Sequence, residues 1–373
     1  MFIRVDKKTL CEAVIPALCA VSSKSTIAAT ECLFLKANEE ENSLTITGYD
    51  INKGLKTKID ATVLSGGSIL LPGYYFSQLI KNMPEGEISI SSDDNFLTTI
   101  SGKKSNIEIS GMSSLSFPTL PELSGDRGFI LSQSELKKMI NHVVFSFSQT
   151  NESKPVLTGI NFKAEKEKLS LCSCDGYRIS YCESKILKGN ELKESFIVPG
   201  KTVIELLKLI DDSDEPIKIE LGRKHIIFSF GSLIFFSRLI DGEYVDFERT
   251  VPKVFKTYVT VNKSDLISAI ERVSLVIDER IKSPVKVTVN PEYVEINCLT
   301  AQGKAREEVS ANVEGEEMLI GFNHKYLIDA LRGAKLSEGD DVMISLASPV
   351  MGIVIRPTEG NEFMYMVLPV RLN

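Results

Sequence analysis

The residues of this sequence best suited to chemistry are thiols and carboxylates. Cys172 and Cys174 lie two residues apart in an alternating strand pattern, which sends both thiols to one face. A structural zinc site would need a second Cys or His pair nearby, and the sequence offers none. The seven cysteines are an odd number without framework spacing. We therefore expect buried, reduced thiols and no bound metal.

The carboxylate pairs lie in segments that do not predict catalysis. They occur at Asp93-Asp94, Asp211-Asp212 and Asp340-Asp341, each in a predicted turn. Carboxylates in turns are usually solvated, so we expect no general acid among them. Gly66-Gly67 precedes a strand and lacks the Lys-Ser/Thr partner of a phosphate-binding loop. The sequence predicts no catalytic residue and no cofactor, which argues against an enzyme.

Two segments have the character of binding surfaces. Residues 174–179 read Cys-Asp-Gly-Tyr-Arg-Ile, a strand that breaks at an Asp-Gly turn and then resumes; an ordinary hairpin is the alternative. Residues 365–372 read Tyr-Met-Val-Leu-Pro-Val-Arg-Leu. So apolar a strand usually belongs to a core, but Pro369 cannot donate a ladder hydrogen bond, so the end must lie at an edge or be exposed. We expect this tail to form the wall of a protein-binding groove.

The elements that position these segments repeat three times along the chain. Three motifs share the same period. An N-capped amphipathic helix is predicted at 5–21, 131–147 and 261–277, and a second helix at 71–80, 198–207 and 320–329. A strand is predicted at 44–48, 169–173 and 294–298. The period of about 125 residues exceeds that of any solenoid or propeller. The sequence therefore predicts three like domains, at 1–126, 127–253 and 254–373.

Each predicted domain is itself duplicated. A β-α-β-β-β pattern occurs twice in each, which predicts an α+β fold with six such sets. Pro16 is expected to kink the first helix. Antiparallel sheets can keep one face in water and carry helices on the other, so domains joined edge to edge would bend into an arc with helices inside and sheets outside. Two such arcs can close as a two-fold ring, which also removes exposed sheet edges.

Charge is distributed unevenly along the chain. The six predicted helices (7–20, 72–83, 134–147, 200–210, 263–276 and 323–335) total +6, which leaves −13 for the rest of a chain whose net charge is −7. One interpretation is that solvated helix faces happen to be rich in lysine. The other is that all the helices face a polyanion. The sequence has no run of about 18 apolar residues and no signal peptide, so we expect a cytoplasmic protein that binds no membrane.

Several of these motifs resemble those of one protein family. Asp-Gly-Tyr-Arg at 175–178, Pro-Val-Leu-Thr-Gly at 155–159, Leu-Ile-Asp-Gly at 239–242, Val198-Pro199, Ile-Gly-Phe-Asn at 320–323 and the ending Leu-Pro-Val-Arg-Leu at 368–372 resemble the bacterial DNA polymerase III β subunit, the β sliding clamp. The resemblance implies a homodimeric ring of six like domains around duplex DNA, without sequence preference and without enzymatic activity. It implies a tether for the polymerase III α subunit, the clamp loader, and other polymerases and repair proteins, which dock a short peptide containing Gln, Leu and Phe.

The resemblance also implies where that peptide binds. Carried over residue by residue, the pocket uses Leu157, Cys174, Gly176, Tyr177, Arg178, Ile179, Val245, Arg249, Thr250, Asn323, Tyr326, Val350, Gly352, Met366, Val367, Leu368, Pro369, Val370, Arg371 and Leu372. Many members have Thr at position 174 and His at position 177, and some have Pro at position 245. These departures leave the pocket apolar and change its fine specificity.

Contacts to DNA and between subunits follow from the same resemblance. Lys24 and Asn151 match a basic and a polar DNA contact, nearby motifs place Lys154 and Lys201, and Tyr74 replaces a basic residue of some relatives. The subunit interface would join an edge of the first domain to an edge of the third. Its residues are Lys103, Lys104, Ile107 and Ile109 on one side, and Leu275, Val276, Glu307 and Glu308 on the other. The alternative for Lys103-Lys104 is a solvated hairpin.

Two other functions remain open at this point. An enzyme of duplicated α+β domains would need convergent polar residues between domains. A monomeric hub with the clamp fold would bind peptides without encircling DNA, and its mass in solution would separate it from a ring.

Overall fold

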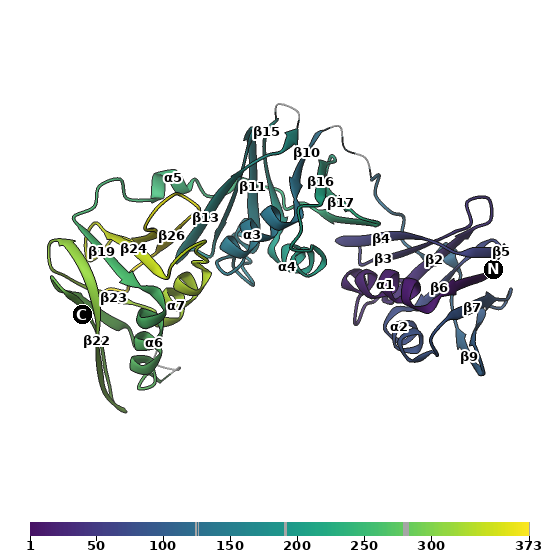
Figure 1. The fold of residues 1–373 in the computed structure, drawn as a ribbon, viewed down its shortest axis with the longest axis horizontal. Coiled ribbons are helices and arrows are strands. Elements are labelled where there is room, and N and C mark those ends of the chain that lie inside the picture. Colours follow the sequence, from purple (N-terminus) through teal and green to yellow (C-terminus); the bar gives the residue numbers. More distant parts are fainter. Residues whose placement is uncertain (124, 126, 190–191, 279–282, 373) are drawn as a thin grey trace. The chain divides into compact units, whose positions relative to one another are not determined.

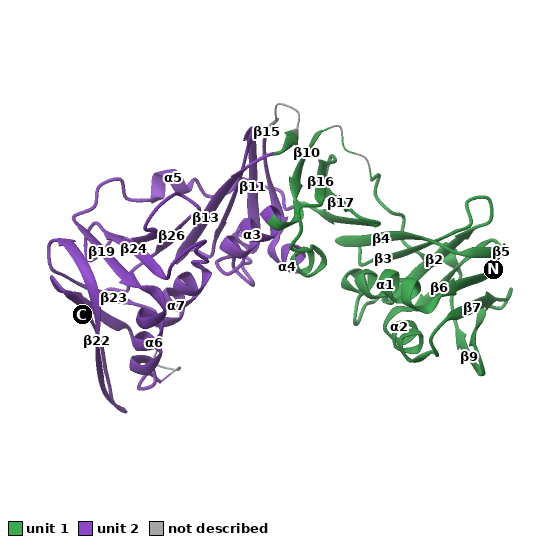
Figure 2. Ribbon diagram, viewed as in Figure 1, with its two compact units in different colours: residues 1–134, 187–190, 205–239 green, residues 135–186, 191–204, 240–373 purple. Residues whose placement is uncertain are grey.

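The structure is a computed structural model that describes residues 1–123, 125, 127–189, 192–278 and 283–372. The chain divides into two compact units (Figure 2). Unit 1 comprises Met1–Ser134, Leu187–Asn190 and Glu205–Leu239, and unit 2 comprises Glu135–Ile186, Glu191–Ile204 and Ile240–Asn373. The predicted domain limits remain predictions, and the residue at the first limit, 126, lies outside the described part of the chain.

Six β-α-β-β-β sets follow one another along the chain, as the sequence predicts (Figure 1). The first two are β1 (Phe2–Asp6), α1 (Lys7–Ala17), β2 (Cys32–Asn38), β3 (Ser43–Tyr49) and β4 (Lys53–Asp60), then β6 (Gly67–Pro72), α2 (Gly73–Asn82), β7 (Glu87–Ser92), β8 (Leu97–Gly102) and β9 (Ser105–Ser110). The next two are β10 (Arg127–Ser132), α3 (Gln133–Val143), β11 (Gly159–Lys166), β12 (Lys168–Cys174) and β13 (Arg178–Lys185), then β15 (Leu192–Pro199), α4 (Gly200–Leu209), β16 (Pro216–Leu221), β17 (His225–Phe230) and β18 (Leu233–Arg238).

The last two sets belong to unit 2. They are β19 (Thr257–Asn262), α6 (Lys263–Ser274), β20 (Val285–Val289), β21 (Tyr293–Thr300) and β22 (Gly303–Gly315), then β23 (Met318–Phe322), α7 (His324–Gly333), β24 (Asp341–Leu346), β25 (Ile353–Pro357) and β26 (Phe363–Val367). Shorter elements join the sets: β5 (Thr62–Ser65), β14 (Lys188–Gly189), α5 (Phe247–Thr250) and 3-10 turns at Leu18–Ala20, Ala28–Glu31, Ser114–Ser116 and Pro155–Thr158.

Helix ends follow local chemistry. Asp6 caps α1, because its carboxylate accepts the backbone N–H groups of Lys8 and Thr9 at 2.8 and 3.2 Å. Asn262 caps α6 in the same way. The kink that the sequence predicts in α1 is at Pro16. This proline lies in the last turn, and the helix ends one residue later and continues as a 3-10 turn, so the hydrogen bond that proline cannot donate is lost only at the helix end.

Two long antiparallel sheets join successive domains at equivalent strands. In unit 1 the nine strands run β14-β10-β16-β17-β18-β4-β3-β2-β6, and in unit 2 the twelve strands run β15-β11-β12-β13-β26-β25-β24-β19-β22-β21-β20-β23. The first sheet is continuous because β4 pairs with β18, and the second because β13 pairs with β26. Each junction therefore joins the last strand of a domain's first set to the last strand of the next domain's second set.

Candidate functional site

The sheet at the β13–β26 junction has two apolar faces. Alternate side chains point to opposite faces of a strand. On β12 and β13, Ser173 and Ser180 face α3, where both hydroxyls donate to the Val143 carbonyl. On β26, Tyr365 faces α7 and donates to the Gly333 carbonyl at 2.7 Å. The residues between these positions therefore lie on the face away from the helices.

That helix-free face carries a buried apolar cluster, which we name the Cys174 cluster. Its buried members are Leu157, Cys172, Cys174, Ile179, Val354 and Met366. Partly buried apolar side chains pack against it: Val156, Tyr181, Tyr244, Val245, Phe247, Val251, Phe255 and Met364. The structure thus brings together four of the predicted pocket residues as buried members and Val245 at their edge. Burial raises the pKa of the Cys174 thiol, so this residue acts as a small neutral side chain.

The Asp-Gly segment forms a tight turn between β12 and β13. One Asp175 carboxylate oxygen accepts the N–H groups of Tyr177 and Arg178 at 2.9 and 3.1 Å, and the Cys174 sulfur accepts that of Gly176 at 3.3 Å. Gly176 has a φ of +95°, which explains glycine at this position. The turn leaves the Tyr177 side chain 59% exposed.

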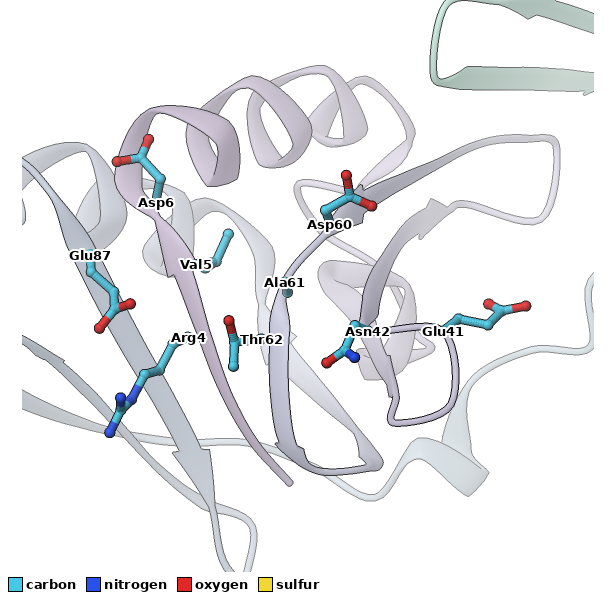
Figure 3. A pocket seen from close by; sticks show the side chains of 9 residues that line it. All are labelled: Arg4, Val5, Asp6, Glu41, Asn42, Asp60, Ala61, Thr62 and Glu87. Atoms are coloured by element: carbon cyan, nitrogen blue, oxygen red, sulfur yellow. The ribbon is translucent and has the colours of Figure 1, made fainter.

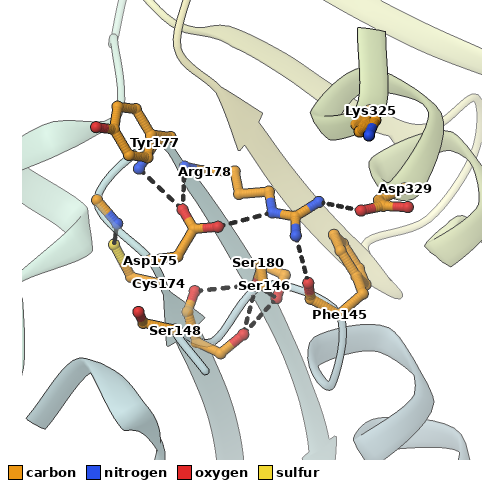
Figure 4. A network of polar contacts seen from close by, with 12 residues as sticks. Phe145, Ser146, Ser148, Cys174, Asp175, Tyr177, Arg178, Ser180, Lys325 and Asp329 are labelled. Carbon is orange, nitrogen blue, oxygen red and sulfur yellow. Dashed lines mark hydrogen bonds and ion pairs between the residues drawn. The ribbon is translucent and has the colours of Figure 1, made fainter. Parts of the chain in front are cut away.

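Arg178 holds this turn in place from within the protein (Figure 4). Its guanidinium donates to Asp175 at 3.0 Å, to Asp329 of α7 at 2.7 Å and to the Phe145 carbonyl at 2.7 Å. It lies 4.8 Å from the centre of the Tyr326 ring, and Tyr326 stacks on Tyr177 at 5.6 Å. Because Arg178 is only 8% exposed and each of its three guanidinium nitrogens donates a hydrogen bond, it positions the rim of the site.

The chain end continues this surface. The Leu368 N–H donates to the Tyr177 carbonyl at 2.9 Å, and the Val370 N–H to the Gly321 carbonyl at 2.8 Å. A Cβ on Gly352 would lie 2.8 Å from Met366 Cγ, so glycine permits their close approach. Large apolar side chains that remain exposed on this part of unit 2 include Tyr177, Val350, Met351, Leu368 and Val370.

Other predicted pocket residues take different roles. The Val367 side chain belongs to the core on the helix side of β26, so it does not face the Cys174 cluster. Arg249 pairs with Asp246 at 3.0 Å, and the Thr250 hydroxyl donates to the Asp246 carbonyl at 3.2 Å, both on α5. Asn323 caps α7 by accepting the Lys325 N–H at 3.0 Å. Pro369 and Leu372 are half-buried, and Arg371 is exposed.

Sequence reasoning missed several residues of this surface. Tyr181 and Val354 share the helix-free face, and the Tyr181 and Phe247 rings lie 4.3 Å apart. Tyr181 could have been found, because it is two residues from Ile179 on the same strand. The family resemblance placed Val245, Arg249 and Thr250 of the segment 244–255 at this site, whereas no local sequence pattern identifies Phe247, Val251 or Phe255 as part of it.

The predicted DNA contacts all lie in exposed or partly exposed positions. Lys24 belongs to unit 1 and is exposed in the segment after α1. In unit 2, Lys154 and Lys201 are exposed, and Asn151 accepts the Lys154 N–H at 2.8 Å. The structure therefore brings Asn151 and Lys154 together.

The predicted interface residues of β9 and β22 lie on strands with an unpaired edge. Lys103 and Lys104 form the β8–β9 turn, and β9, with Ile107 and Ile109, is an edge strand of the sheet β5-β1-β7-β8-β9. In unit 2, β22 pairs with β21 through residues 303–310 and with β19 through residues 311–315 only. Within the described residues, the first part of β22 thus has one paired side and one unpaired side.

Glu307 and Glu308 of β22 already have partners in their own chain. Arg272 donates to both carboxylate oxygens of Glu307 at 2.9 Å, and Arg306 pairs with Glu308 at 2.7 Å. Leu275 is 80% exposed just beyond α6, whereas Val276 packs against the core.

A polar cavity of about 570 Å³ lies elsewhere, in unit 1 (Figure 3). It is lined by Arg4, Val5, Asp6, Glu41, Asn42, Asp60, Ala61, Thr62 and Glu87. Asp6 caps α1, and Glu41 accepts from Lys58 at 2.8 Å, so two of its carboxylates have structural roles.

No cluster of His, Cys, Asp and Glu with metal-binding geometry occurs in the described part of the chain. No described helix is both long and apolar enough to span a membrane.

Comparisons with known proteins cover the whole chain. Models of the DNA polymerase III beta subunit match its N-terminal domain at residues 1–121, its central domain at 130–246 and its C-terminal domain at 248–371. The beta sliding clamp of Bacillus subtilis is 31% identical over 376 residues, with 98% of each chain covered. A solved DNA polymerase sliding clamp from B. subtilis is 30% identical, with a TM-score of 0.95 and full coverage of both chains. A solved putative DNA polymerase III beta subunit from Eubacterium rectale is 31% identical, with a TM-score of 0.93 and 99% coverage of each chain.

Proposed function

Because this chain belongs to the family of bacterial DNA polymerase III beta subunits, we propose that it acts as a DNA sliding clamp, a tether that encircles duplex DNA and holds replication proteins on it. The observation that carries this proposal is the full-length agreement with sliding clamps in sequence and fold, across all three domains. Such a protein works through binding rather than catalysis. Its place of action is the cytoplasm, where bacterial DNA lies.

The tether raises processivity through effective concentration. A polymerase linked to a ring around DNA meets the primer end again before it diffuses away. The positive helix segments within an acidic chain suit a wall that faces phosphates. Contacts to phosphates carry no sequence information, so a ring held by them can slide. The candidates for these contacts are Lys24, Asn151, Lys154 and Lys201.

Partners would dock a short peptide beside the Cys174 cluster. The exposed apolar side chains Tyr177, Leu368 and Val370 border a buried cluster, which suits insertion of Leu and Phe side chains. Each apolar side chain that becomes fully buried contributes roughly 1.5–3 kcal/mol before ordering costs. We expect the polymerase III α subunit, the clamp loader and repair proteins to share this surface.

Two copies would close the ring through strand edges. The unpaired side of β22 residues 303–310 and the edge strand β9 each offer free backbone groups, which a second chain can pair. Ile107 and Leu275 would supply apolar contacts, and Lys103 and Lys104 would lie near the acidic residues of β22. A monomeric hub is the competing assignment, and the mass in solution separates the two.

Retention on DNA tests the clamp directly. The protein is loaded onto nicked circular plasmid by the clamp loader of the same bacterium, and the complex is isolated by gel filtration. We expect it to stay on the circle and to leave once the plasmid is cut, because topology rather than affinity holds it. Equal retention on circular and linear DNA would contradict the proposal.

Deletion of residues 368–373 tests the peptide surface and spares strand β26, which ends at Val367. The truncated chain should keep its melting temperature within a few degrees and lose binding of a fluorescent peptide containing Gln, Leu and Phe. Binding with unchanged affinity would show that the peptide docks elsewhere.

A further inference from the structure

The two sheet junctions are built in the same register. In unit 2, Cys174 pairs with Ile179 across β12 and β13, and Ile179 pairs with Met366 across the junction. In unit 1, Tyr49 pairs with Gly54 across β3 and β4, and Gly54 pairs with Phe236 across the junction. Val354 then pairs with Met366, as Ile227 pairs with Phe236.

The turn beside each junction is also the same. Asp50 accepts the N–H groups of Asn52 and Lys53 at 3.0 and 2.8 Å and pairs with the Lys53 ammonium at 2.7 Å. Asp175 makes the corresponding bonds to Tyr177 and to the backbone and side chain of Arg178. Ile51 has a φ of +76°, and Gly176 has a φ of +95°, so the second residue of both turns is left-handed.

The strands across the two junctions, β18 and β26, each end with an equivalent backbone hydrogen bond to the neighbouring turn. The Arg238 N–H donates to the Asn52 carbonyl at 2.7 Å, and the Leu368 N–H to the Tyr177 carbonyl at 2.9 Å. On both helix-free faces a buried cluster forms at the paired positions. In unit 1 its buried members are Tyr49, Ile227 and Phe236, and we name it the Tyr49 cluster.

The side chains at these equivalent positions differ in size and polarity. Phe236 lies over Gly54, where a Cβ would come within 2.1 Å of its ring, so an aromatic ring fills the space that Ile179 and Met366 share in unit 2. Tyr49 stands where unit 2 has Cys174. The rim residues are Asn52 and Arg238, where unit 2 exposes Tyr177 and Leu368.

The segment 117–123, which lies between β9 and β10, covers the Tyr49 cluster. Phe117, Leu120 and Leu123 pack against it, and the Phe117 ring lies 6.4 Å from Tyr49 and 5.1 Å from Phe34. An isolated bridge joins Leu70 to Met112 ahead of segment 117–123, and another joins Ile197 to Ile240 ahead of segment 244–255. Counted from these bridges, Phe117 is the counterpart of Val245.

We propose that the chain carries two copies of one peptide-docking scaffold, and that Tyr49, Phe236 and Phe117 close the copy in unit 1. Segment 117–123 then forms the wall that segment 244–255 forms in unit 2, and the larger ring of Phe117, at the position of Val245, fills space that a partner peptide would enter. This inference rests on the proposed peptide docking in unit 2, and it explains why the chain docks one peptide rather than two.

Exchange of the equivalent residues tests it in both directions. The opened variant carries Tyr49→Cys, Gly54→Ile, Phe117→Val and Phe236→Met, with Asn52→Tyr and Arg238→Leu at the rim. The closed variant carries Cys174→Tyr, Ile179→Gly and Met366→Phe. Calorimetric titration with the peptide Gln-Leu-Ala-Leu-Phe gives the number of sites per chain, and circular dichroism with thermal melting checks folding.

Wild type should bind one peptide per chain, the opened variant two, and the closed variant should bind at least about 30-fold more weakly, which is the scale of a hot-spot loss. A chain that combines both sets should bind one peptide, now in unit 1. If wild type binds none, the proposed docking function fails. If wild type binds one and a folded opened variant still binds one, the inference fails.

The closed variant and a milder substitution still test the inference if the opened variant does not fold. Phe117→Val alone removes the ring of segment 117–123 without touching a fully buried position. It should add a weak second site in unit 1. A chain that combines Phe117→Val with the closed variant's substitutions should keep that site. A closed variant that folds and binds peptide as wild type does would overturn the role of these positions.

Discussion

At the scale of residues, the site depends on side chains that no ligand needs to touch. Each of the three guanidinium nitrogens of Arg178 donates one hydrogen bond, to Asp175, Asp329 and the Phe145 carbonyl, and Tyr326 covers its face. Charge-assisted bonds of this kind are stronger than neutral ones. The arginine therefore fixes the Asp-Gly turn and, through it, the orientation of Tyr177.

Asp329→Asn should weaken peptide binding without unfolding the chain. An amide oxygen still accepts from Arg178 but loses the charge assistance, which we estimate at about 1 kcal/mol, or roughly fivefold in the peptide Kd. Fluorescence polarisation with a labelled peptide measures this. Glu316→Gln removes the same charge from an exposed pair with Lys256 and should leave the peptide Kd unchanged. Equal effects of both substitutions would point to net charge instead.

His142 makes stability depend on pH. It is 1% exposed, it donates through Nδ1 to Tyr365 at 2.7 Å, and its Nε2 has no partner among the described residues. Burial lowers its pKa to about 4. The unfolded chain, with an ordinary value near 6.5, therefore binds more protons between these limits. Stability is complete above about pH 6.5 and falls as pH drops towards 4, by about 3 kcal/mol.

Urea unfolding at pH 7, 5.5 and 4.5 checks this expectation. His142→Asn keeps a donor near Tyr365 and cannot titrate, so it should flatten the pH dependence of the unfolding free energy. Any remaining slope belongs to carboxylates such as Glu362, whose pKa is lowered chiefly by its bond from Ser337. A slope identical to that of wild type would remove His142 from this role.

At the scale of elements, the alternation of side chains along the strands gives the sheet two separate apolar faces at the β13–β26 junction and at the β4–β18 junction. On β26, Tyr365 and Val367 serve the core beneath the helices, whereas Met364 and Met366 serve the Cys174 cluster. A one-residue shift in register would exchange these sets. The close approach of Gly54 to Phe236 fixes the register at the other junction.

Gly54→Ala should destabilise the chain, because the new Cβ would lie 2.1 Å from the Phe236 ring. Overpacking of this kind costs about 1–3 kcal/mol. Phe236→Leu in the same chain makes room, so the double variant should lose less free energy of unfolding than the two single losses combined. Urea unfolding of the four proteins gives this coupling. Additive losses would show that the ring and the glycine do not constrain each other.

At the scale of the whole molecule, ring closure would depend on two strand edges. Exposed edges invite pairing with another chain, and closed symmetry uses them up. Glu307 and Glu308 already bind Arg272 and Arg306 within the chain. Lys103 and Lys104 would thus meet a network of mixed charge, which favours steering of association over strong attraction.

Leu275→Asp should convert dimers to monomers, because a carboxylate replaces an 80% exposed leucine that we place in a buried contact. Light scattering after gel filtration should show the mass fall from two chains to the 41.3 kDa of one. Leu115→Asp, at a leucine that is 94% exposed, is the matched control and should leave the mass unchanged. An unchanged dimer for Leu275→Asp would exclude this edge from the interface.

The sequence by itself determined the repetition and the local structure. Amphipathic periodicity and capping residues such as Asp6 are local signals, so the six β-α-β-β-β sets could be predicted from them. The Asp-Gly turn at 175–176 was equally readable, because its hydrogen bonds span only four residues. The family resemblance then pointed to Leu157, Cys174, Ile179 and Met366 as one site.

Tertiary structure alone decided which residues meet. The bond from Arg178 to Asp329 spans 151 residues, and the pairing of β4 with β18 joins segments even further apart in the chain. No local pattern encodes such contacts, because they depend on the register of strands that pair only after the domains form. For the same reason, the sequence could not show that Val367 turns away from the Cys174 cluster, or that Phe117 covers an equivalent surface at the other junction.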